Sequence, residues 1–288
     1  MNNVDKLLLK LSNLNEAENN IEREWVSSTQ KIYNEIIKFD YFLNEKNMIN
    51  LLYLFNQSEE LLENVKKTNI YLSKYYFERL ENIYNNLSEN ELKEYFSTLY
   101  YPAIAYYEYI FGDEIKAVFK FERCIYFINN NSNLNKSLTF QLVSCEQTLN
   151  RFKCFFKMKN IENALNESDI LLNKINIELN QHNSYDEIFC YYLDKLFSKI
   201  EFDDENVIKF ISLNQRNFEL YFLSTKKNVN KTILSNIPTS FNIDITLENF
   251  DEIMTCPSII KKIIFKFFCY YYYSNREDRK GFRMKLSY

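Results

Sequence analysis

Apolar residues recur along most of the chain at intervals of three and four positions, the spacing that places them on one face of an α-helix. Asparagine-rich polar clusters interrupt this pattern around 13–20, 44–47, 129–135 and 180–186, and Gly112 followed by Asp113 makes a further break. The uninterrupted stretches predict nine helices up to residue 202: 3–17, 21–38, 44–67, 70–87, 89–111, 113–130, 135–158, 160–178 and 184–202.

One of these helices, 89–111, carries two local signals of its own. Ser88 and Glu91 have the spacing of a capping box, in which the two side chains satisfy free amides at a helix start. Pro102 lies within the predicted helix 89–111 and should bend it, because proline cannot donate the helical hydrogen bond.

The pattern changes after residue 202. A further helix is predicted from Asp203 to about Leu223, followed by a region of weak periodicity, 226–251, in which FNIDITL alternates as an extended segment would. A last helix, 258–274, precedes the basic tail NREDRKGFRMKLSY. The sequence therefore predicts a helical domain over 1–202 and a C-terminal extension over 203–288.

The composition supports an all-α fold. The chain of 288 residues contains only two glycines and three prolines, whereas average usage would give about twenty glycines. Tight turns and phosphate-cradling loops need glycine, so sheet-rich and nucleotide-loop folds are not expected. With 46% hydrophobic and 17% aromatic residues, the chain can bury a core rich in Tyr and Phe.

Charge and cysteine usage narrow the partners and the compartment. The net charge of -4 supplies no overall field for a phosphate backbone, so we expect no nucleic-acid partner. The six cysteines show no CxxC and no zinc-like spacing, which favours buried, reduced thiols in a cytoplasmic protein. The N-terminus lacks the features of a signal peptide. The apolar run 259–273 is too short to span a bilayer and is interrupted by lysines, so no membrane partner is expected.

Signals of catalysis are almost absent from the sequence. No GxGxxG, GxxxxGK, HExxH or GxSxG motif occurs, and the single histidine, His182, lies in an Asn-rich loop without cysteine or carboxylate neighbours in a recognisable pattern. We therefore expect a solvated His182, no metal, no cofactor and no enzymatic activity.

One stretch is similar to a tetratricopeptide repeat. The segment GDEIKAVFKFERCI, residues 112–125, places Ala117, Phe121 and Cys124 as in the second helix of such a repeat. The segment NIENALNESDILL, which begins at Asn160, repeats the pattern with Ala164. The two alanines differ by 164 minus 117, or 47 residues, against a usual period of about 34. Any antiparallel helix pair also needs small residues where its helices cross. A tetratricopeptide-like scaffold that binds unmodified peptides or partner helices is the alternative function.

A more specific resemblance is to the 14-3-3 family. LNRFKCFFKMKN, residues 149–160, resembles the Leu-Asn-x-x-x-x-Tyr-Tyr-Glu-x-x-Asn of that family's seventh helix. FLNEKNMINLLYLFN is similar to the start of its third helix, YYEYIFGD to the end of its fifth, and SYDEIFCYYLDKLFSKIEF to its ninth. The resemblance covers residues 1 to about 202. It implies a non-catalytic adaptor, a homodimer built from the first four helices, and a concave groove for phosphorylated client peptides.

The phosphate pocket of that family is missing. Its four basic and tyrosine positions align here with apolar residues, namely Leu54, Leu61, Ile104 and Ala105. A doubly charged phosphate needs charge-assisted donors, which these side chains lack. The resemblance therefore implies an absent or rebuilt pocket.

The groove itself has candidates on the predicted helix 135–158. Asn150 matches the family's groove asparagine, and Lys153 and Lys157 follow at positions that share its helix face. This row either attracts an anionic peptide or is an ordinary solvated face opposite Phe152. The residues that the resemblance places along the groove are Leu149, Asn150, Lys153, Lys157, Ser198 and Phe202.

The sequences of the two ends of the chain suggest a dimer contact and a possible ligand. Leu7, Leu8, Leu9 and Leu11 give the first predicted helix more apolar surface than one neighbour covers, which favours a homodimer. At the other end, Ser287 and Tyr288 follow several basic residues, an arrangement that resembles the C-terminal phosphoserine ligands of 14-3-3 proteins. The tail is thus either a tethered self-ligand or a solvated basic terminus.

Overall fold

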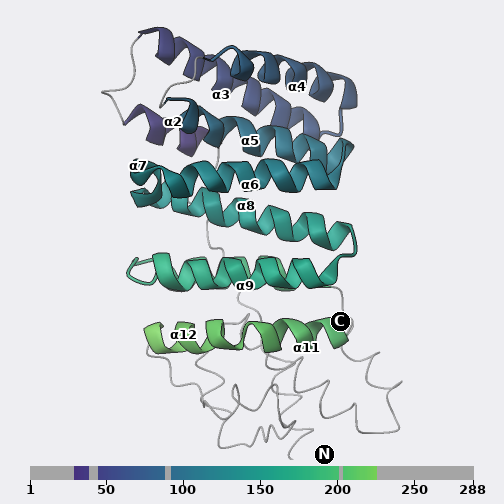
Figure 1. Cartoon of the computed structure of the whole chain (residues 1–288), viewed down its shortest axis with the longest axis vertical. Coiled ribbons are helices and arrows are strands. Elements are labelled where there is room, and N and C mark those ends of the chain that lie inside the picture. Colours follow the sequence, from purple (N-terminus) through teal and green to yellow (C-terminus); the bar gives the residue numbers. More distant parts are fainter. Residues whose placement is uncertain (1–28, 39–44, 88–91, 201–203, 226–288) are drawn as a thin grey trace, which may run out of the picture. The chain divides into compact units, whose positions relative to one another are not determined.

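The computed structural model describes residues 29–38, 45–87, 92–200 and 204–225, and every regular element among these residues is an α-helix (Figure 1). The predicted all-α fold class is confirmed. The described helices are α2 (Thr29–Ile37), α3 (Glu45–Lys66), α4 (Ile70–Asn85), α5 (Leu92–Phe111), α6 (Glu114–Asn130), α7 (Ser132–Lys136), α8 (Leu138–Lys157), α9 (Ile161–Glu178), α10 (Tyr185–Phe197), α11 (Asp204–Leu213) and α12 (Gln215–Thr225).

Asparagine and aspartate begin several of these helices. The side chain of Asn69 accepts a hydrogen bond from the backbone N–H of Leu72 at the start of α4. Asp113 caps α6, and Asn131 caps α7 by accepting from the N–H groups of Asn133 and Leu134. These short polar side chains satisfy amides that have no partner within the helix, which is how a glycine-poor chain makes its turns.

Two helices end in a left-handed residue that is not glycine. Thr68 after α3 has a φ of 54°, and Lys159 after α8 has a φ of 59°. In both places the next residue closes the helix end with a bond that spans five residues, from Asn69 N–H to the Asn64 carbonyl (3.0 Å) and from Asn160 N–H to the Phe155 carbonyl (2.9 Å). This is the Schellman arrangement, which usually places glycine at the left-handed position.

The chain forms two compact units, which divide between Leu171 and Leu172 within α9. One unit, 23–171, contains the described residues up to Leu171, and the other contains the described residues 172–200 and 204–225. The boundary predicted between residues 202 and 203 falls in the range 201–203, outside the described residues.

In the unit 23–171, helices pack in the order of the chain. α3 packs on α4 and α5, α5 on α6, and α6 on α8, and Figure 1 shows α5, α6 and α8 stacked with roughly parallel axes. The aromatic content enters this core: the rings of Tyr84 and Tyr100 stack with centroids 3.8 Å apart, and the Tyr84 hydroxyl lies 2.6 Å from Ser97 Oγ. Burial raises the pKa of both tyrosines well above the usual range. Pro102 lies inside α5, as predicted.

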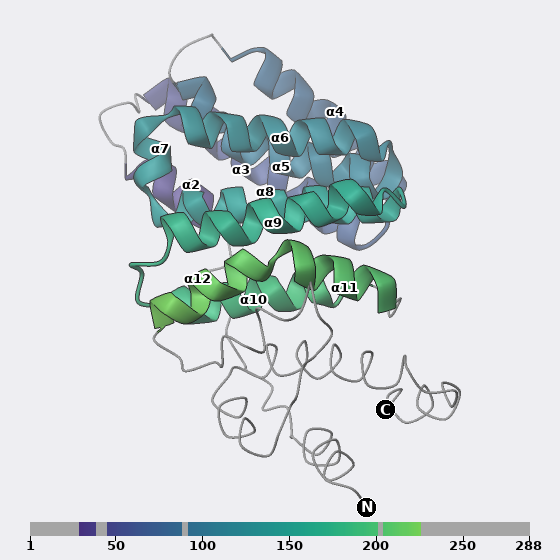
Figure 2. The same cartoon turned by 60° about the horizontal axis from the view of Figure 1, so that its bottom comes forward.

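The unit that contains α10, α11 and α12, whose ribbons are seen in Figure 2, has several buried polar contacts. Asn176 donates from Nδ2 to the backbone carbonyl (3.1 Å) and to Oδ1 (3.2 Å) of Asn217 on α12. The Tyr185 hydroxyl donates to Asn176 Oδ1, and the Tyr221 hydroxyl donates to Asp186. These bonds link the end of α9, the start of α10 and α12, and they satisfy amides that burial would otherwise penalise.

Two predicted helices differ from the structure. The stretch predicted as 135–158 contains a break at Ser137, where an extended residue (ψ 126°) separates α7 from α8. The stretch predicted from 203 to 223 is two helices, α11 and α12, which meet at Asn214. The predicted elements 3–17, 226–251 and 258–274, and the capping box of Ser88 with Glu91, lie outside the described residues.

Four cysteines, at 124, 145, 154 and 190, are buried thiols outside any disulfide, as expected; Cys256 and Cys269 lie outside the described part of the chain. Burial raises the pKa of the Cys154 thiol to about 12, so this thiol stays protonated at neutral pH. In the described ranges, no helix combines the length and the apolar character that crossing a membrane requires.

Candidate functional site

One face of α8 is polar along most of the helix. Glu146, Asn150, Lys153 and Lys157 recur at intervals of four, three and four residues, so they line one side of α8, while Phe152 is buried on another. We call these four residues the α8 polar face.

The middle of the α8 polar face is internally paired. Lys153 Nζ donates to Asn150 Oδ1 (3.0 Å) and lies 3.8 Å from Glu146 Oε1. The side chains of Lys153 and Glu146 are only 23% and 20% exposed, so this face is partly sheltered rather than fully solvated. The pairing also neutralises the lysine that the sequence offered as an attractor for anionic peptides.

Lys157 connects the end of α8 to the junction of α5 and α6. Its Nζ donates to the backbone carbonyl of Tyr109 (2.7 Å), pairs with Glu114 (2.8 Å) and lies 4.9 Å from the centroid of the Tyr109 ring. The hydrogen bond from Lys157, together with Glu114's own backbone N–H, holds the pKa of the Glu114 carboxyl below its ordinary value. Lys157 is therefore an interhelical contact as well as a surface charge.

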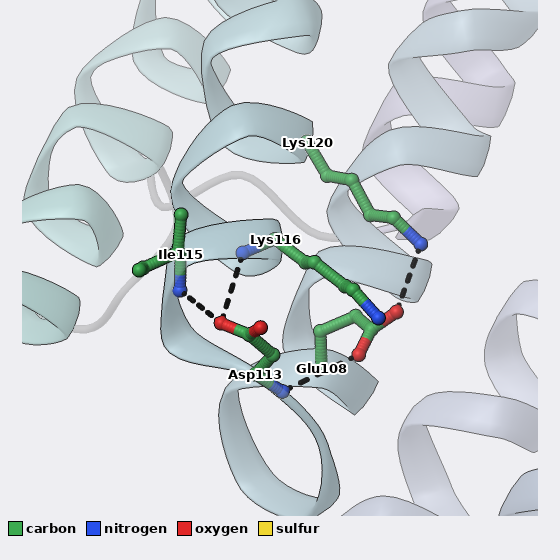
Figure 3. Close-up of polar contacts among 5 residues, drawn as sticks. All are labelled: Glu108, Asp113, Ile115, Lys116 and Lys120. Atoms are coloured by element: carbon green, nitrogen blue, oxygen red, sulfur yellow. Dashed lines mark hydrogen bonds and ion pairs between the residues drawn. The ribbon is translucent and has the colours of Figure 1, made fainter.

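The α5–α6 junction beside Lys157 is itself ordered by two acidic residues (Figure 3). Glu108 on α5 accepts from Lys120 Nζ (3.1 Å) and from the backbone N–H of Asp113 (3.4 Å). The Asp113 carboxylate accepts from the N–H groups of Ile115 (2.8 Å) and Lys116 (3.4 Å) at the start of α6. These bonds fix one border of the α8 polar face.

A buried ion pair lies on the α9 side of α8. Arg151 Nη2 pairs with Glu167 Oε1 on α9 at 2.9 Å, and the Glu167 residue is only 4% exposed. Burial raises the pKa of Glu167; Arg151 opposes this shift and Glu122 adds to it. Burial thus disfavours the charged form of this carboxyl, whereas the ion pair with Arg151 favours it.

Four polar atoms at this site are buried without a hydrogen-bond partner among the described residues. They are Glu146 Oε2, Gln147 Oε1, Arg151 Nε and Glu167 Oε2. Buried polar atoms are satisfied in the great majority of cases, by protein, water or ligand. Three of these atoms lie on α8 and one lies on α9, so the boundary between the two helices keeps unused hydrogen-bonding capacity.

The remaining predicted groove residues are placed differently. Leu149 is buried in the core, so a peptide cannot contact it from solvent. Ser198 is exposed at the end of α10, in the other unit, and its hydroxyl donates to the Lys195 carbonyl (3.1 Å). Phe202, Ser287 and Tyr288 lie outside the described residues.

The positions aligned with the 14-3-3 phosphate pocket belong to the interior. Leu54, Leu61, Ile104 and Ala105 are all buried, and the first three pack in one apolar cluster. They supply neither a cation nor an open surface at the aligned place.

His182 is more involved in the fold than its loop position suggested. It is half-buried in the turn between α9 and α10, where its Nδ1 accepts a hydrogen bond from the Ser184 N–H (3.1 Å). The expectation of a solvated side chain is wrong because this nitrogen serves the helix start. Within the described ranges, no group of three or more His, Cys, Asp or Glu residues could hold a metal ion.

Sequence analysis missed the partners that shape the α8 polar face. Glu114 and Glu167 come from other helices, and nothing local in the sequence relates them to Lys157 or Arg151. One signal in the sequence could have pointed to a second polar side of α8: Gln147 and Arg151 are four residues apart and therefore share one side of the helix.

Comparison of the chain with protein-family models, curated proteins and solved structures found no match. The 14-3-3 resemblance therefore stays a prediction that rests on the sequence segments given above.

Proposed function

We propose that this protein is a non-catalytic adaptor of 14-3-3-like character that binds an extended peptide segment of a client protein along the α8 polar face. The observation that supports the proposal is the row of partly exposed polar side chains that runs along α8. An extended peptide presents N–H and C=O groups in alternation, and such a row can pair with both.

Asn150 is the central contact in this proposal. Its Oδ1 accepts from Lys153, which orients the side-chain amide. An asparagine amide offers a donor and an acceptor at once and so matches one peptide unit. Glu146 and Lys153 lie on either side and favour client side chains that can join their hydrogen bonds.

The charges of this face, and those of the neighbouring Arg151 pair, support a binding mode that does not depend on phosphate. Lys153 faces Glu146, Lys157 faces Glu114, and Arg151 faces Glu167. A phosphate group would have to compete with these carboxylates for each cation, and it would be repelled by them.

The test is an array of peptides in phosphorylated and unphosphorylated form, followed by solution affinities for the best binders. We expect Asn150→Ala to weaken binding about tenfold, whereas Asn163→Ala, an exposed asparagine on α9, leaves it unchanged. Phosphorylated and unphosphorylated forms should bind within a few-fold of each other.

Two results would count against this proposal. If no peptide binds, or if Asn150→Ala has no effect on the binders, the α8 polar face is an ordinary surface. A hundredfold gain on phosphorylation, about 2.7 kcal/mol, would show instead that a phosphate pocket exists elsewhere, with Lys66, Lys67 and Arg123 as the next candidates.

A further inference from the structure

The solvent-facing side of α6 carries three large apolar side chains. Ile115, Phe119 and Tyr126 are 55%, 62% and 52% exposed, and with Glu122 they follow one another at intervals of four, three and four residues. The opposite side of the same helix enters the core through Ala117, Phe121, Cys124 and Ile128. A surface helix normally turns polar residues outward, so this arrangement leaves a second apolar stripe without a neighbour.

A row of cations runs beside this stripe. Lys116, Lys120 and Arg123 are spaced by four and three residues. Lys120 is paired with Glu108, but Lys116 and Arg123 have no carboxylate within 4.0 Å among the residues that the structure describes. Glu122, which is exposed on the stripe, likewise has no cation within 4.0 Å among the described residues, so two unpaired cations stand against one unpaired carboxylate and the net uncompensated charge is positive.

Arg123 is held in place by aromatic rings rather than by an acid. Its guanidinium carbon lies 5.3 Å from the ring centroid of Tyr126 and 5.0 Å from that of Phe127. Stacking of this kind restrains the side chain while leaving its N–H donors able to bind an anion. Tyrosine and arginine are also the residue types that contribute most at protein interfaces.

We propose that this face of α6 binds an amphipathic helix of a partner protein whose apolar stripe is flanked by acidic residues. The four-three-four spacing of Ile115, Phe119, Glu122 and Tyr126 is the seam by which one helix packs along another. Acidic residues on the flank of the partner would meet Lys116 and Arg123, and such complementarity selects partners and orients them.

The charge pattern argues against a second copy of this chain as the occupant. A two-fold interface brings the same patch of both copies together. The basic row would then lie against the basic row of the copy, and the like charges would repel. An acidic helix avoids this repulsion and gains the ion pairs.

This surface is distinct from the α8 polar face and takes a different ligand. The α8 polar face offers hydrogen bonds to an extended backbone and has compensated charges. The α6 face offers apolar anchors and free cations to a folded helix. An adaptor with both surfaces could join two different proteins.

The experiment uses the full chain and a labelled synthetic helix about three heptads long, with leucine along one stripe and glutamate on both flanks. A matched peptide carries lysine in place of glutamate. Fluorescence anisotropy should show that the acidic helix binds at least tenfold more tightly than the basic one. Added salt should weaken the binding of the acidic helix, because exposed ion pairs are screened.

Three variants assign the binding to this surface. Phe119→Glu should abolish binding of the acidic helix, and Arg123→Glu should weaken it about tenfold and narrow the gap between the two peptides. Tyr71→Glu replaces a side chain that is 87% exposed on α4 and should change nothing. Circular dichroism checks that each variant is folded; all three positions are exposed, so the fold should tolerate them.

Three outcomes would overturn the proposal. The acidic helix could fail to bind, the two peptides could bind equally, or Tyr71→Glu could reduce the affinity for the acidic helix as much as Phe119→Glu does. A concentration-dependent doubling of mass that Phe119→Glu abolishes would instead assign the face to a second copy. Asn150→Ala should leave the acidic helix bound, so failure here is separable from failure of peptide binding on α8.

Discussion

Gly112 leaves room for the carboxylate of Glu108. A methyl group at Gly112 would overlap Glu108 Oε2 and would lie 3.1 Å from the Glu108 Cα. The carboxylate cannot simply move aside, because Lys120 and the N–H of Asp113 hold it. Gly112 does not have a positive φ. Its value here is the space it leaves, whereas the sequence suggested only a break between helices.

We expect Gly112→Ala to destabilise the protein by about 1–3 kcal/mol, the usual range for overpacking. Urea denaturation measures this cost. In a Glu108→Ala background the carboxylate is absent, so Gly112→Ala should lower the free energy of unfolding by clearly less. Equal costs in the two backgrounds would show that the carboxylate is not the obstacle.

At the scale of helices, the apolar period located the elements well. The observed bounds of α3, α6 and α9 lie within one residue of those predicted, because strong periodicity and polar junctions mark both limits. The break at Ser137 carries no glycine or proline and was missed. The α8 polar face was predicted in part: Asn150 and Lys153 are close in sequence, whereas Glu114, Tyr109 and Glu167 reach α8 only through tertiary packing.

The buried Glu167, which pairs with Arg151 of α8, should make the stability of the protein depend on pH. Burial raises the pKa of Glu167 above its ordinary value of 4.5. The folded state then binds a proton more tightly than the unfolded state, so the contribution of this group is greatest below pH 4.5 and is lost as the pH rises through the raised pKa.

Glu167→Gln removes this titration. Across a series of denaturation curves from pH 4 to pH 7, we expect the wild-type protein to lose stability relative to the Gln variant as the pH rises. Glu162→Gln, at an exposed position in the first turn of α9, is the control and should show no such trend. A constant difference between wild type and Glu167→Gln would mean that Arg151 fully offsets the burial of the charge.

At the scale of the whole molecule, the two proposed surfaces differ in how their charges are arranged. The charges of α8 are compensated by ion pairs within the fold, while Lys116 and Arg123 on α6 have no carboxylate within 4.0 Å among the described residues. With a net charge of -4, the chain as a whole is acidic, so the α6 face is a local exception. Such an exception guides a partner to one place on an otherwise repelling surface.

Assembly is the remaining property of the whole chain. The leucines at 7, 8, 9 and 11, which lie outside the described residues, predict a homodimer. Light scattering at micromolar concentration should then report twice the chain mass of 35.0 kDa. Leu7→Glu combined with Leu11→Glu should return the mass to that of one chain, while Phe119→Glu on α6 should not. A single-chain mass for the wild type would contradict the prediction.

The left-handed residues that end α3 and α8 have a consequence for engineering. Thr68 and Lys159 hold a backbone conformation that costs a residue with a Cβ about 1 kcal/mol, and a branched Thr more. Glycine at either position removes this cost and keeps the closing bonds, so Thr68→Gly and Lys159→Gly should each raise the melting temperature by a few degrees. Two exposed turns of this glycine-poor chain are therefore sites at which a single substitution should raise its thermal stability.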